Sequence, residues 1–475
     1  MKKIIFLFLV ILINLQVQSH PWKPAHYVII DTDGGIDDMR SISMMLASPN
    51  VRVLAVIASP GALSAENAYL KVRSMLNSFF HEGIPVGINR NRIYISKNLP
   101  VALQYNWGDE NGIDPLVAPE YLKVITDVFK YEKTKISFVC LGGMATCAEA
   151  IRKIPEFKSQ VKQIVWSCNG LNDTKGFNFS IDSNAAREVL GGAITVKAVK
   201  STDNFIFYDD NLIACLEKIN TRYGKNVLRF MQSEAAKNHQ FSLNINDELI
   251  PLYLHYPELF LTIQQGNNSE ITPSDLISLK DRYLKILKGE TAVKNQVIKE
   301  LPEDPDFYFD DIKPFVSEII ERYGEDEWQS GVLANELHRH LGVFAIIGVK
   351  MGIRAREYFN TGVDEFEAVS FAGSVSPLSC MNDGIQVSTG ATPGHGLLSV
   401  RNDTPLPAAE FKYMNHRIKL TLKPDLAKKI SGELKEINFV YGLDSDIYWE
   451  LVRKNAIKYW RDFDRHEIFD IEVIQ

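Results

Sequence analysis

The sequence predicts an α/β domain with a mostly parallel sheet and flanking helices, followed by a smaller α+β domain. Three observations support this prediction. Short apolar runs alternate with amphipathic stretches up to about residue 199, the composition changes near residue 325, and 475 residues exceed the roughly 100–200 that one domain usually holds. With 45% hydrophobic and 23% charged residues, the chain has a globular composition.

The first half has the pattern of βαβ units. Residues 65–79 and 145–154 are amphipathic with helical spacing, and they alternate with apolar runs typical of buried strands. The strand-like runs are residues 27–30, 51–57, 136–141, 161–166 and 194–199. Strands that alternate with helices in this way indicate a buried parallel sheet. Residues from about 211 to 287 are expected to be mainly helical.

The second half follows a connector over residues 300–311, which is rich in Pro, Asp and Glu, and a helix near 314–323. Residues 337–358 have a helical pattern, 368–371 resemble a strand, and 374–396 are rich in small residues and glycine. Strand and helix patterns alternate from there to the end. This half is therefore expected to be a separate α+β domain.

The N-terminus has the features of a secretory signal. Two lysines precede an apolar run over residues 4–15, and Ser19 stands where a small residue precedes a cleavage site. We expect a signal peptide at 1–19, domains at 20–324 and 325–475, and a protein exported to the periplasm or the extracellular space. The alternative is a membrane anchor, although the run is shorter than the roughly 20 residues that a span needs. No later segment is long and apolar enough, so no membrane association is expected after signal removal.

Net charge and cysteine content restrict the partners. A formal charge of −7 argues against nucleic acid, since phosphate binding needs clustered Lys and Arg. The five cysteines are Cys140, Cys147, Cys168, Cys215 and Cys380. An odd number without CxxC spacing predicts neither a disulfide framework nor a zinc ribbon. Most of these thiols are expected to be buried as small hydrophobic side chains.

Four carboxylates follow the first predicted strand. Asp31 and Asp33 end an apolar run, two glycines turn the chain, and Asp37 and Asp38 begin a helix. Ligands bind at the carboxyl ends of strands in parallel α/β sheets, and clustered carboxylates repel one another unless a cation joins them. Oxygen ligands on a flexible loop favour calcium, with magnesium second. The alternative is a solvated acidic cluster at a helix N-terminus.

This run, Asp-Thr-Asp-Gly-Gly-Ile-Asp-Asp, resembles the Asp-x-Asp-Pro-Gly-x-Asp-Asp motif of the inosine-uridine nucleoside hydrolase family, with Gly34 in place of Pro. Three later segments are similar to further motifs of that family, in the same order. They are Leu-Gly-Gly-Met-Ala-Thr at 141–146, Gly-Phe-Asn-Phe-Ser-Ile-Asp-Ser-Asn-Ala-Ala at 176–186, and Asn-Asp-Glu at 246–248 followed by Tyr-Pro-Glu-Leu-Phe at 256–260. The resemblance covers about residues 27–260.

The resemblance implies a calcium-dependent hydrolase of N-glycosidic bonds in nucleosides or related ribosides, with a homo-oligomer as a reasonable assembly. The implied calcium ligands are Asp33, Asp38, Asp247 and the backbone carbonyl of Leu141. The implied substrate contacts are Asp37, Asn178 and Asp247. Asp33 and Asn178 are the implied catalytic residues, because Asp33 accepts a proton from water that calcium activates and Asn178 holds the sugar.

The chain also departs from the family pattern. The Asn that follows the second strand falls at Ala62, the Glu of Glu-Phe-Asn falls at Gly176, and the leaving-group His falls at Asn246. The metal ligands are therefore expected to be retained while contacts to sugar and base are fewer. His239 and Tyr253 lie nearby in sequence as candidate proton donors for the leaving group.

Two other functions remain open for the first half. Asp-Thr-Asp-Gly could be the nucleophile and acid pair of a haloacid dehalogenase-type phosphatase, although the segments after residue 140 have no place in that family. Alternatively, the lost contacts favour a non-catalytic metalloprotein that binds sugars or nucleosides.

The second half carries three motifs of its own. They are Glu-Leu-His-Arg-His-Leu-Gly at 336–342, which is expected to open a helix, Cys-Met-Asn-Asp-Gly-Ile-Gln at 380–386, and Thr-Gly-Ala-Thr-Pro-Gly-His-Gly at 389–396. Together they resemble the formylmethanofuran dehydrogenase E family, whose motifs are similar to His-x-His-x-Cys-Pro-Gly, Cys-x-x-Asp-x-x-Gln and Thr-Gly-Cys-Thr-x-Gly.

This second resemblance implies a transition-metal pocket, for zinc or another transition metal, which imidazole and thiolate ligands suit. The implied ligands are His338, His340 and Cys380. Two cysteines of the family are missing, at Gly342 and Ala391, and His395 is a candidate replacement. The alternative is a domain that kept the fold and lost the metal, and the resemblance implies no activity for this half.

Overall fold

The computed structural model describes residues 24–90, 97, 99–202, 205–239, 243–290, 301–403 and 405–474. The predicted signal peptide at 1–19 lies outside the described residues. Within the described part of the chain, no helix combines the length and apolar character needed to cross a membrane. Four of the five cysteines are buried and only Cys215 is exposed, which confirms the expectation for most of these thiols.

An eight-stranded sheet forms the centre of the first part, in the order β3-β2-β1-β4-β5-β6-β8-β7. Its strands are β1 (His26–Thr32), β2 (Val51–Ala58), β3 (Val86–Ile88), β4 (Ile136–Cys140), β5 (Val161–Cys168), β6 (Val196–Lys200), β7 (Phe260–Gln265) and β8 (Asn268–Pro273). Every neighbouring pair is parallel except β7 with β8. The predicted parallel α/β architecture is confirmed.

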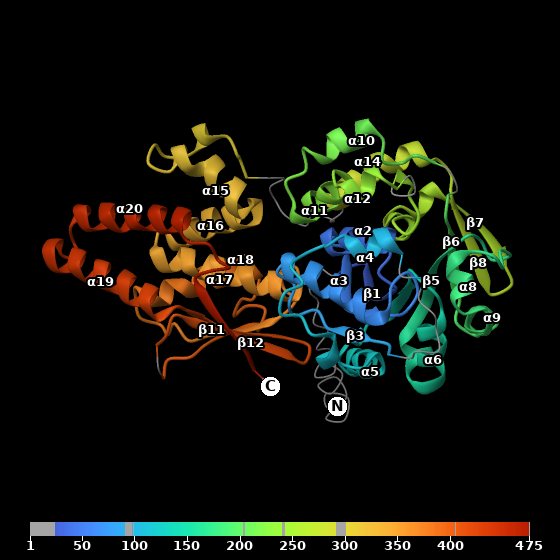
Figure 1. Cartoon of the computed structure of the whole chain (residues 1–475). Helices are drawn as coiled ribbons and strands as arrows, with labels where there is room; N and C mark the ends of the chain where they lie inside the picture. The colour runs from blue at the N-terminus through green and yellow to red at the C-terminus, as the bar shows by residue number, and fades with distance from the viewer. Residues whose placement is uncertain are drawn as a thin grey trace, which may run out of the picture.

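Helices cover both faces of this sheet (Figure 1). One face carries α2 (Ile36–Ala47), α3 (Ala65–Ser78), α4 (Pro100–Gln104), α10 (Asp210–Leu216), α11 (Arg222–Met231), α12 (Glu234–Lys237), α13 (Leu249–His255) and α14 (Leu276–Leu287). The other carries α5 (Tyr121–Tyr131), α6 (Ala145–Lys153), α7 (Phe157–Gln160), α8 (Phe177–Ile181) and α9 (Ser183–Leu190).

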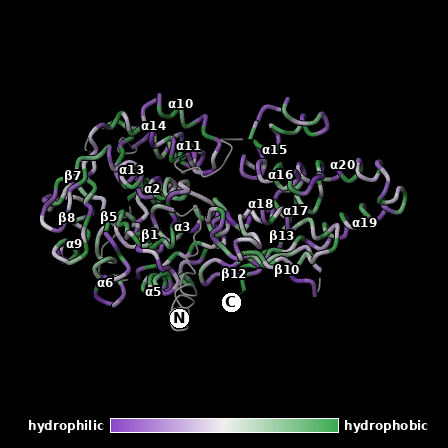
Figure 2. The backbone as a smooth tube through the Cα atoms, turned by 180° about the vertical axis from the view of Figure 1, so that it is seen from behind, coloured by the Kyte–Doolittle hydropathy of each residue, from purple (hydrophilic) through white to green (hydrophobic). Residues whose placement is uncertain are grey.

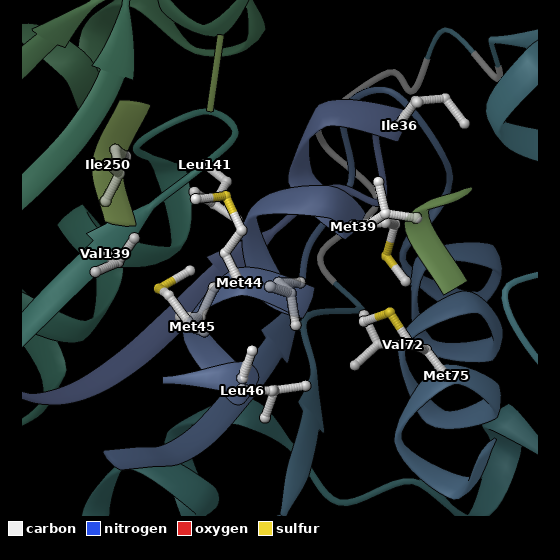
Figure 3. Close-up of a cluster of buried hydrophobic side chains, with 14 of the residues drawn as sticks. Ile36, Met39, Met44, Met45, Leu46, Val72, Met75, Val139, Leu141 and Ile250 are labelled. Carbon is white, nitrogen blue, oxygen red and sulfur yellow. The ribbon is translucent and has the colours of Figure 1, made fainter. Parts of the chain in front are cut away.

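Side chains of β1 alternate between two hydrophobic cores. Val28 and Ile30 belong to the core under α2 and α3, whereas Ile29 belongs to the core under α5 and α6. Figure 3 shows part of the first core, where Met39 and Met45 of α2 lie among apolar side chains of α3 and β4. Because both faces are buried, the strands are nearly continuously apolar, which is the pattern that the sequence displayed.

Residues 211–287 are mainly helical, as expected, except for one segment. The strands β7 and β8 form a hairpin whose turn contains Gly266 with φ +62° and Asn267. Glycine tolerates this left-handed conformation, and β8 then joins the sheet edge beside β6. The Gly-Asn pair between two runs that each place Thr next to Ile was the available signal.

The second part has five strands in the order β10-β9-β11-β12-β13 and helices packed around them. Its elements are α15 (Val316–Tyr323), α16 (Glu325–His338), α17 (Val343–Phe359), β9 (Glu367–Ser370), α18 (Met381–Thr389), β10 (Leu398–Val400), β11 (Ala408–Tyr413), β12 (His416–Leu422), α19 (Pro424–Tyr441), α20 (Asp446–Asp462) and β13 (Phe469–Ile474). All its strand pairs except β9 with β10 are antiparallel, which confirms an α+β fold.

This second part has its own hydrophobic core, which includes Val316 and Ile319 of α15 as well as the strands. Helix α15 therefore packs with the C-terminal elements. Seen from behind, hydrophobic stretches run along both sheets, whereas α19 and α20 carry mixed residues (Figure 2). One motif expectation also needs correction here. His338 ends α16 and Gly342 precedes α17, so the His-x-His segment joins two helices instead of opening one.

The two parts lie side by side, with α17 directed toward α3 (Figure 1). Arg52 of β2 is buried and its Nε donates to Glu365 at 2.8 Å. Arg354 of α17 pairs with Glu82, which follows α3, at 2.7 Å. These ion pairs span the interface and fix the orientation of the two parts, because moving the parts away from each other would leave the charges without partners.

Candidate functional site

The acidic loop lies at a topological switch point of the parallel sheet. From β1 the chain runs outward to β2 and β3, then returns to β4 on the other side of β1. The Leu141 backbone N–H, just after β4, donates to the Asp31 carbonyl at 2.8 Å and ties the two strand ends together. A cavity of about 440 Å³ opens there, within the size range of small-ligand sites.

The turn between β1 and α2 depends on Gly34. Its φ of +79° is one that the ring of a proline cannot adopt, so the Gly found in place of Pro changes the turn conformation. Two bonds then fix the side chain of Asp38 in the first turn of α2. Its Oδ2 accepts from the Thr32 hydroxyl at 2.6 Å and from the Asp33 backbone N–H at 3.1 Å.

Three of the predicted carboxylates converge. One oxygen each of Asp37, Asp38 and Asp247 lies within 4.8 Å of the other two. Burial raises the pKa of Asp38 to about 6, and the charge of Asp37 adds to this rise. Burial likewise holds the pKa of Asp247 well above its usual range, with further contributions from Asp37 and Asp38. The cluster therefore favours a bound cation, which would offset this repulsion.

Asp33 is buried beside this cluster but is not one of the three converging carboxylates. Its Oδ2 is buried without a hydrogen-bond partner and faces Gly61 and Gly142. A Cβ at Gly142 would lie 2.8 Å from Oδ2, and one at Gly61 would collide with it. Burial, followed by the charge of Asp38, raises the pKa of Asp33 well above its usual range. The orphaned oxygen is a second observation that fits a cation or water there.

Asn178 and Leu141 are in direct contact. The Asn178 amide donates to the Leu141 carbonyl at 2.6 Å and to the Ser167 carbonyl at 3.1 Å. The carbonyl predicted as a metal ligand thus already accepts one bond, and its second lone pair is available. Asn178 connects the carboxyl ends of β4 and β5, which fixes α8 at the rim of the cavity.

The loop that carries Asp247 is held by α2 itself. Arg40 pairs with Glu248 at 2.6 Å between fully buried side chains, and the Ser41 hydroxyl donates to the Asp247 carbonyl at 3.0 Å. Asn246, which replaces the family His, donates to Asp37 at 3.1 Å. One face of α2 therefore positions both the acidic loop and its distant partner.

Several of these supporting residues were not predicted from the sequence. Thr32, Arg40, Ser41 and Ser167 are polar and buried next to the site. Polar residues inside an otherwise apolar strand or helix face were the available signal, because their partners are up to 208 positions away, as Glu248 is from Arg40 (248 − 40 = 208). Only the fold reveals such pairs.

Of the two candidate proton donors, only His239 lines the cavity. Its Nδ1 lies 3.1 Å from the Ala235 carbonyl, an arrangement in which Nδ1–H donates and Nε2 is left for other partners. Tyr253 packs its ring against Phe260, with centroids 5.6 Å apart, and does not line the cavity. Phe177 of α8 lies on the cavity wall and supplies an aromatic face.

A second cluster lies in the C-terminal part. Donor atoms of His338, His340 and Cys380 lie within 4.8 Å of one another. The two imidazoles are two positions apart, a spacing that points them away from each other on a helix. Arg339 between them has φ +68°, which ends α16 and brings the ring centroids to 4.1 Å. A left-handed conformation at a non-glycine residue costs energy and often marks a functional site.

The donors of this cluster are oriented for a metal ion. His338 Nδ1 lies 2.8 Å from the Asp383 carboxylate, while its Nε2 is buried without a partner. A carboxylate that fixes one ring nitrogen and leaves the other for metal is typical of zinc sites. Burial raises the pKa of the Cys380 thiol to about 11, and burial with the charge of His338 lowers the pKa of His340. The predicted replacement His395 is elsewhere, beside Asp364 at 3.2 Å.

These observations define a class of protein, an α/β enzyme with a carboxylate-lined cavity at the switch point of a parallel sheet. Residues 28–304, more than half of the chain, match the family described as inosine-uridine preferring nucleoside hydrolase. The chain belongs to this family of glycosyl hydrolases, and the phosphatase alternative is set aside. Residues 337–438 match the family described as FmdE, molybdenum formylmethanofuran dehydrogenase operon.

Individual relatives are distant. The probable uridine nucleosidase 1 of Oryza sativa subsp. japonica is 26% identical over 201 residues, which are 39% of this chain and 62% of that protein. The non-specific ribonucleoside hydrolase RihC of Klebsiella pneumoniae is 24% identical over 247 residues, 49% of this chain and 80% of that protein. A purine-preferring ribonucleoside hydrolase structure from Gardnerella vaginalis is 18% identical with a TM-score of 0.43, covering 56% of this chain and 99% of that one.

Proposed function

We propose that this protein hydrolyses the N-glycosidic bond of nucleosides or related ribosides in the carboxylate-lined cavity, with calcium as its cation. The observation that carries the proposal is the convergence of Asp37, Asp38 and Asp247 at the switch point. Oxygen ligands alone favour calcium over zinc. Asp33, Asp38, Asp247 and the Leu141 carbonyl would hold the ion, and Asp37, Asn178 and Asp247 would contact the sugar.

The reaction exchanges the C1′–N bond of the riboside for a C1′–O bond to water. A bound divalent cation would lower the pKa of a neighbouring water and neutralise the carboxylates. Asp33 lines the cavity, with its Oδ2 packed against Gly61 and Gly142, and it would accept the proton that this water loses. Carboxylates around the ring stabilise the positive charge that develops at the anomeric carbon.

The departing base takes the electron pair of the broken bond and needs a proton. Asn246 cannot supply it, because an amide has no acidic proton near neutral pH. His239 is the donor that the cavity offers, through Nε2–H of its imidazolium while Nδ1–H stays bound to the Ala235 carbonyl. Phe177 lines the cavity, and the ring face opposite Lys97 Nζ, which lies 4.4 Å from the ring centroid, would be available for a planar base to stack on.

The first test is hydrolysis of a nucleoside panel by the full chain in calcium, with Asp33→Asn as the variant. We expect hydrolysis by the wild type and a loss of about 10³-fold in kcat for the variant, since the proton acceptor is removed. Asp281→Asn on the exposed face of α14 is the matched control. A wild type that binds ribosides but hydrolyses none would favour the non-catalytic alternative.

The role of His239 has a separate test that compares two leaving groups. His239→Gln should lower kcat on nucleosides by about 10²-fold, because general acid catalysis typically contributes 10²–10⁴-fold. The same variant should retain its activity on a 4-nitrophenyl riboside, whose phenolate departs without a proton. An equal loss on both substrates would show that His239 does not protonate the leaving group.

For the C-terminal part we propose a site for zinc or another transition metal at His338, His340 and Cys380. The orphaned Nε2 of His338 and its Asp383 partner support this assignment. Elemental analysis of the purified protein should find one transition-metal equivalent that Cys380→Ser loses. Full retention of that metal by the variant would contradict the site.

A further inference from the structure

The backbone at position 342 gives no reason for a glycine. Gly342 has φ −110° and ψ 137°, an extended conformation open to any residue. Its N–H donates to the side chain of Asn335 at 3.0 Å, so the position is held firmly between α16 and α17. The backbone conformation therefore does not explain why residue 342 lacks a side chain.

The missing side chain would point into the His–Cys cluster. A Cβ at Gly342 would lie 3.4 Å from His340 Nε2 and 3.6 Å from His338 Nε2. Nε2 is the nitrogen of His338 that a metal ion would use, since Asp383 occupies Nδ1 and Nε2 is buried without a partner. A side chain at position 342 could therefore supply a fourth donor, and glycine leaves that space empty.

Three donors are too few for a closed site. Structural zinc sites have four protein ligands, whereas sites with three keep a position for an outside ligand. Among the described residues, the cluster comprises only His338, His340 and Cys380. Asp383 is committed to His338, and His395 lies beside Asp364 instead.

The cluster is also reachable from the surface. His340 lines a surface hollow together with Trp449, Arg339 and Arg453. The rings of His340 and Trp449 meet edge to face with centroids 5.0 Å apart. A small molecule in this hollow would lie against the same imidazole that faces Gly342.

We propose that the C-terminal metal site is an open one, whose fourth position at Gly342 takes an exchangeable small thiolate from solution. The inference rests on the proposed metal site at His338, His340 and Cys380. A soft donor fits because the cluster already combines imidazole with thiolate, which suits soft or borderline ions. A thiol that enters the position releases its proton to the buffer.

The test uses cobalt(II) as the metal probe in the full chain and 2-mercaptoethanol as the thiol. Cobalt bound through Cys380 gives a thiolate charge-transfer band, and each further thiolate adds to it. We expect 2-mercaptoethanol roughly to double the band in the wild type, because one thiolate becomes two. Gly342→Cys should show the doubled band without added thiol and should not respond further.

Gly432→Cys is the matched control, because Gly432 lies in α19 with open space around it. It adds a thiol away from the site and should behave like the wild type. A cobalt band that is absent, or that survives Cys380→Ala, refutes the underlying metal site. A Cys380-dependent band that 2-mercaptoethanol leaves unchanged, or cobalt that the thiol strips from the protein, refutes the open position alone. The wild-type titration decides this even if Gly342→Cys does not fold.

Discussion

The carboxylate cluster of the parallel-sheet part and the His–Cys cluster of the C-terminal part are assembled in different ways. Asp38 and Asp247 are 209 positions apart and meet only because the whole sheet and α2 bring them together. His338 and His340 meet through one left-handed residue between two helices. The first cluster therefore depends on the global fold, and the second depends on a local turn and the start of α18.

The two clusters also differ in donor chemistry. The first presents oxygens only, which suit a hard ion such as calcium, and the second presents nitrogen and sulfur, which suit a transition metal. Buried cross-interface pairs such as Arg52 with Glu365 hold the two parts together. We therefore predict that the protein binds two ions independently of each other, one in each cluster. The following substitutions test this prediction, from the largest expected effect to the smallest.

The largest effect is expected from Asp247→Asn. Removing this carboxylate should lower kcat/KM for ribosides by about 10³-fold, since a ligand and a sugar contact are lost together. In EDTA the same variant should be more stable than the wild type, by roughly 1–2 °C if about 1 kcal/mol of repulsion is relieved. Steady-state kinetics and thermal melting in calcium and in EDTA measure both changes.

Asp281→Asn again serves as the control and should alter neither quantity. If Asp247→Asn destabilised the protein in EDTA as much as in calcium, the carboxylate would be a structural group and not part of a cation site. A cation site predicts that Asp247→Asn lowers kcat/KM in calcium but raises thermal stability in EDTA. A purely structural carboxylate predicts a loss of stability in both.

The next effect concerns the contact between the two parts. Glu357 of α17 is buried and accepts from Arg465 at 2.7 Å, from His466 at 2.9 Å and from Arg222 of the parallel-sheet part. Glu357→Ala would remove the buried carboxylate that these side chains share, while Arg465 keeps Glu327 and His466 keeps Asp464 as partners. The loss should cost about 3 kcal/mol of unfolding free energy, because part of the buried charge is no longer compensated. Urea unfolding measures this loss.

Glu367→Ala is the control for that prediction, because Glu367 makes only an exposed pair with Lys412. Exposed pairs contribute at most about 1 kcal/mol. If Glu357→Ala lost no more unfolding free energy than Glu367→Ala, the buried ion pairs around Glu357 would not be what holds the two parts together.

The sequence could predict the sheet, the acidic loop and the His-x-His segment, because each depends on local periodicity or on a short motif. The strands around Val28 and Val53 are apolar on both faces, which only a buried parallel sheet explains. The contacts of Arg40 with Glu248 and of Asn178 with Leu141 could not be predicted, since each joins segments that the fold alone brings together. The left-handed Arg339 was equally hidden, because arginine carries no signal for that conformation.

A smaller, pH-dependent effect is expected from His81 at the same interface. Burial and the charge of Arg222 lower the pKa of His81 to about 3, from 6.5 in the unfolded chain. The ring is neutral in the folded protein, with Nε2 at 2.8 Å from the Tyr223 hydroxyl. Because the unfolded chain takes up the proton first, stability is complete above pH 6.5 and falls as the pH drops toward 3.

From pH 6.5 to 5 the wild type should therefore lose about 1.6 kcal/mol more than His81→Gln, whose side chain does not titrate. Urea unfolding at both pH values measures the difference between the two proteins, which cancels the titration of every other group. Parallel pH profiles would mean that His81 is protonated in the folded state as well.

The smallest effect on riboside hydrolysis is expected from Cys380→Ser. The variant should lose the transition metal yet change kcat/KM by less than about twofold, because mutations at distant sites without shared partners act independently. Elemental analysis and kinetics on one preparation measure both quantities. A fall of more than fivefold would mean that the His–Cys cluster acts on the cavity across the interface. The two sites would then be energetically coupled. The ion pairs of α17 would be the contacts to test next, since that helix begins directly after Gly342 and Arg354 near its end pairs with Glu82, in the loop that follows α3.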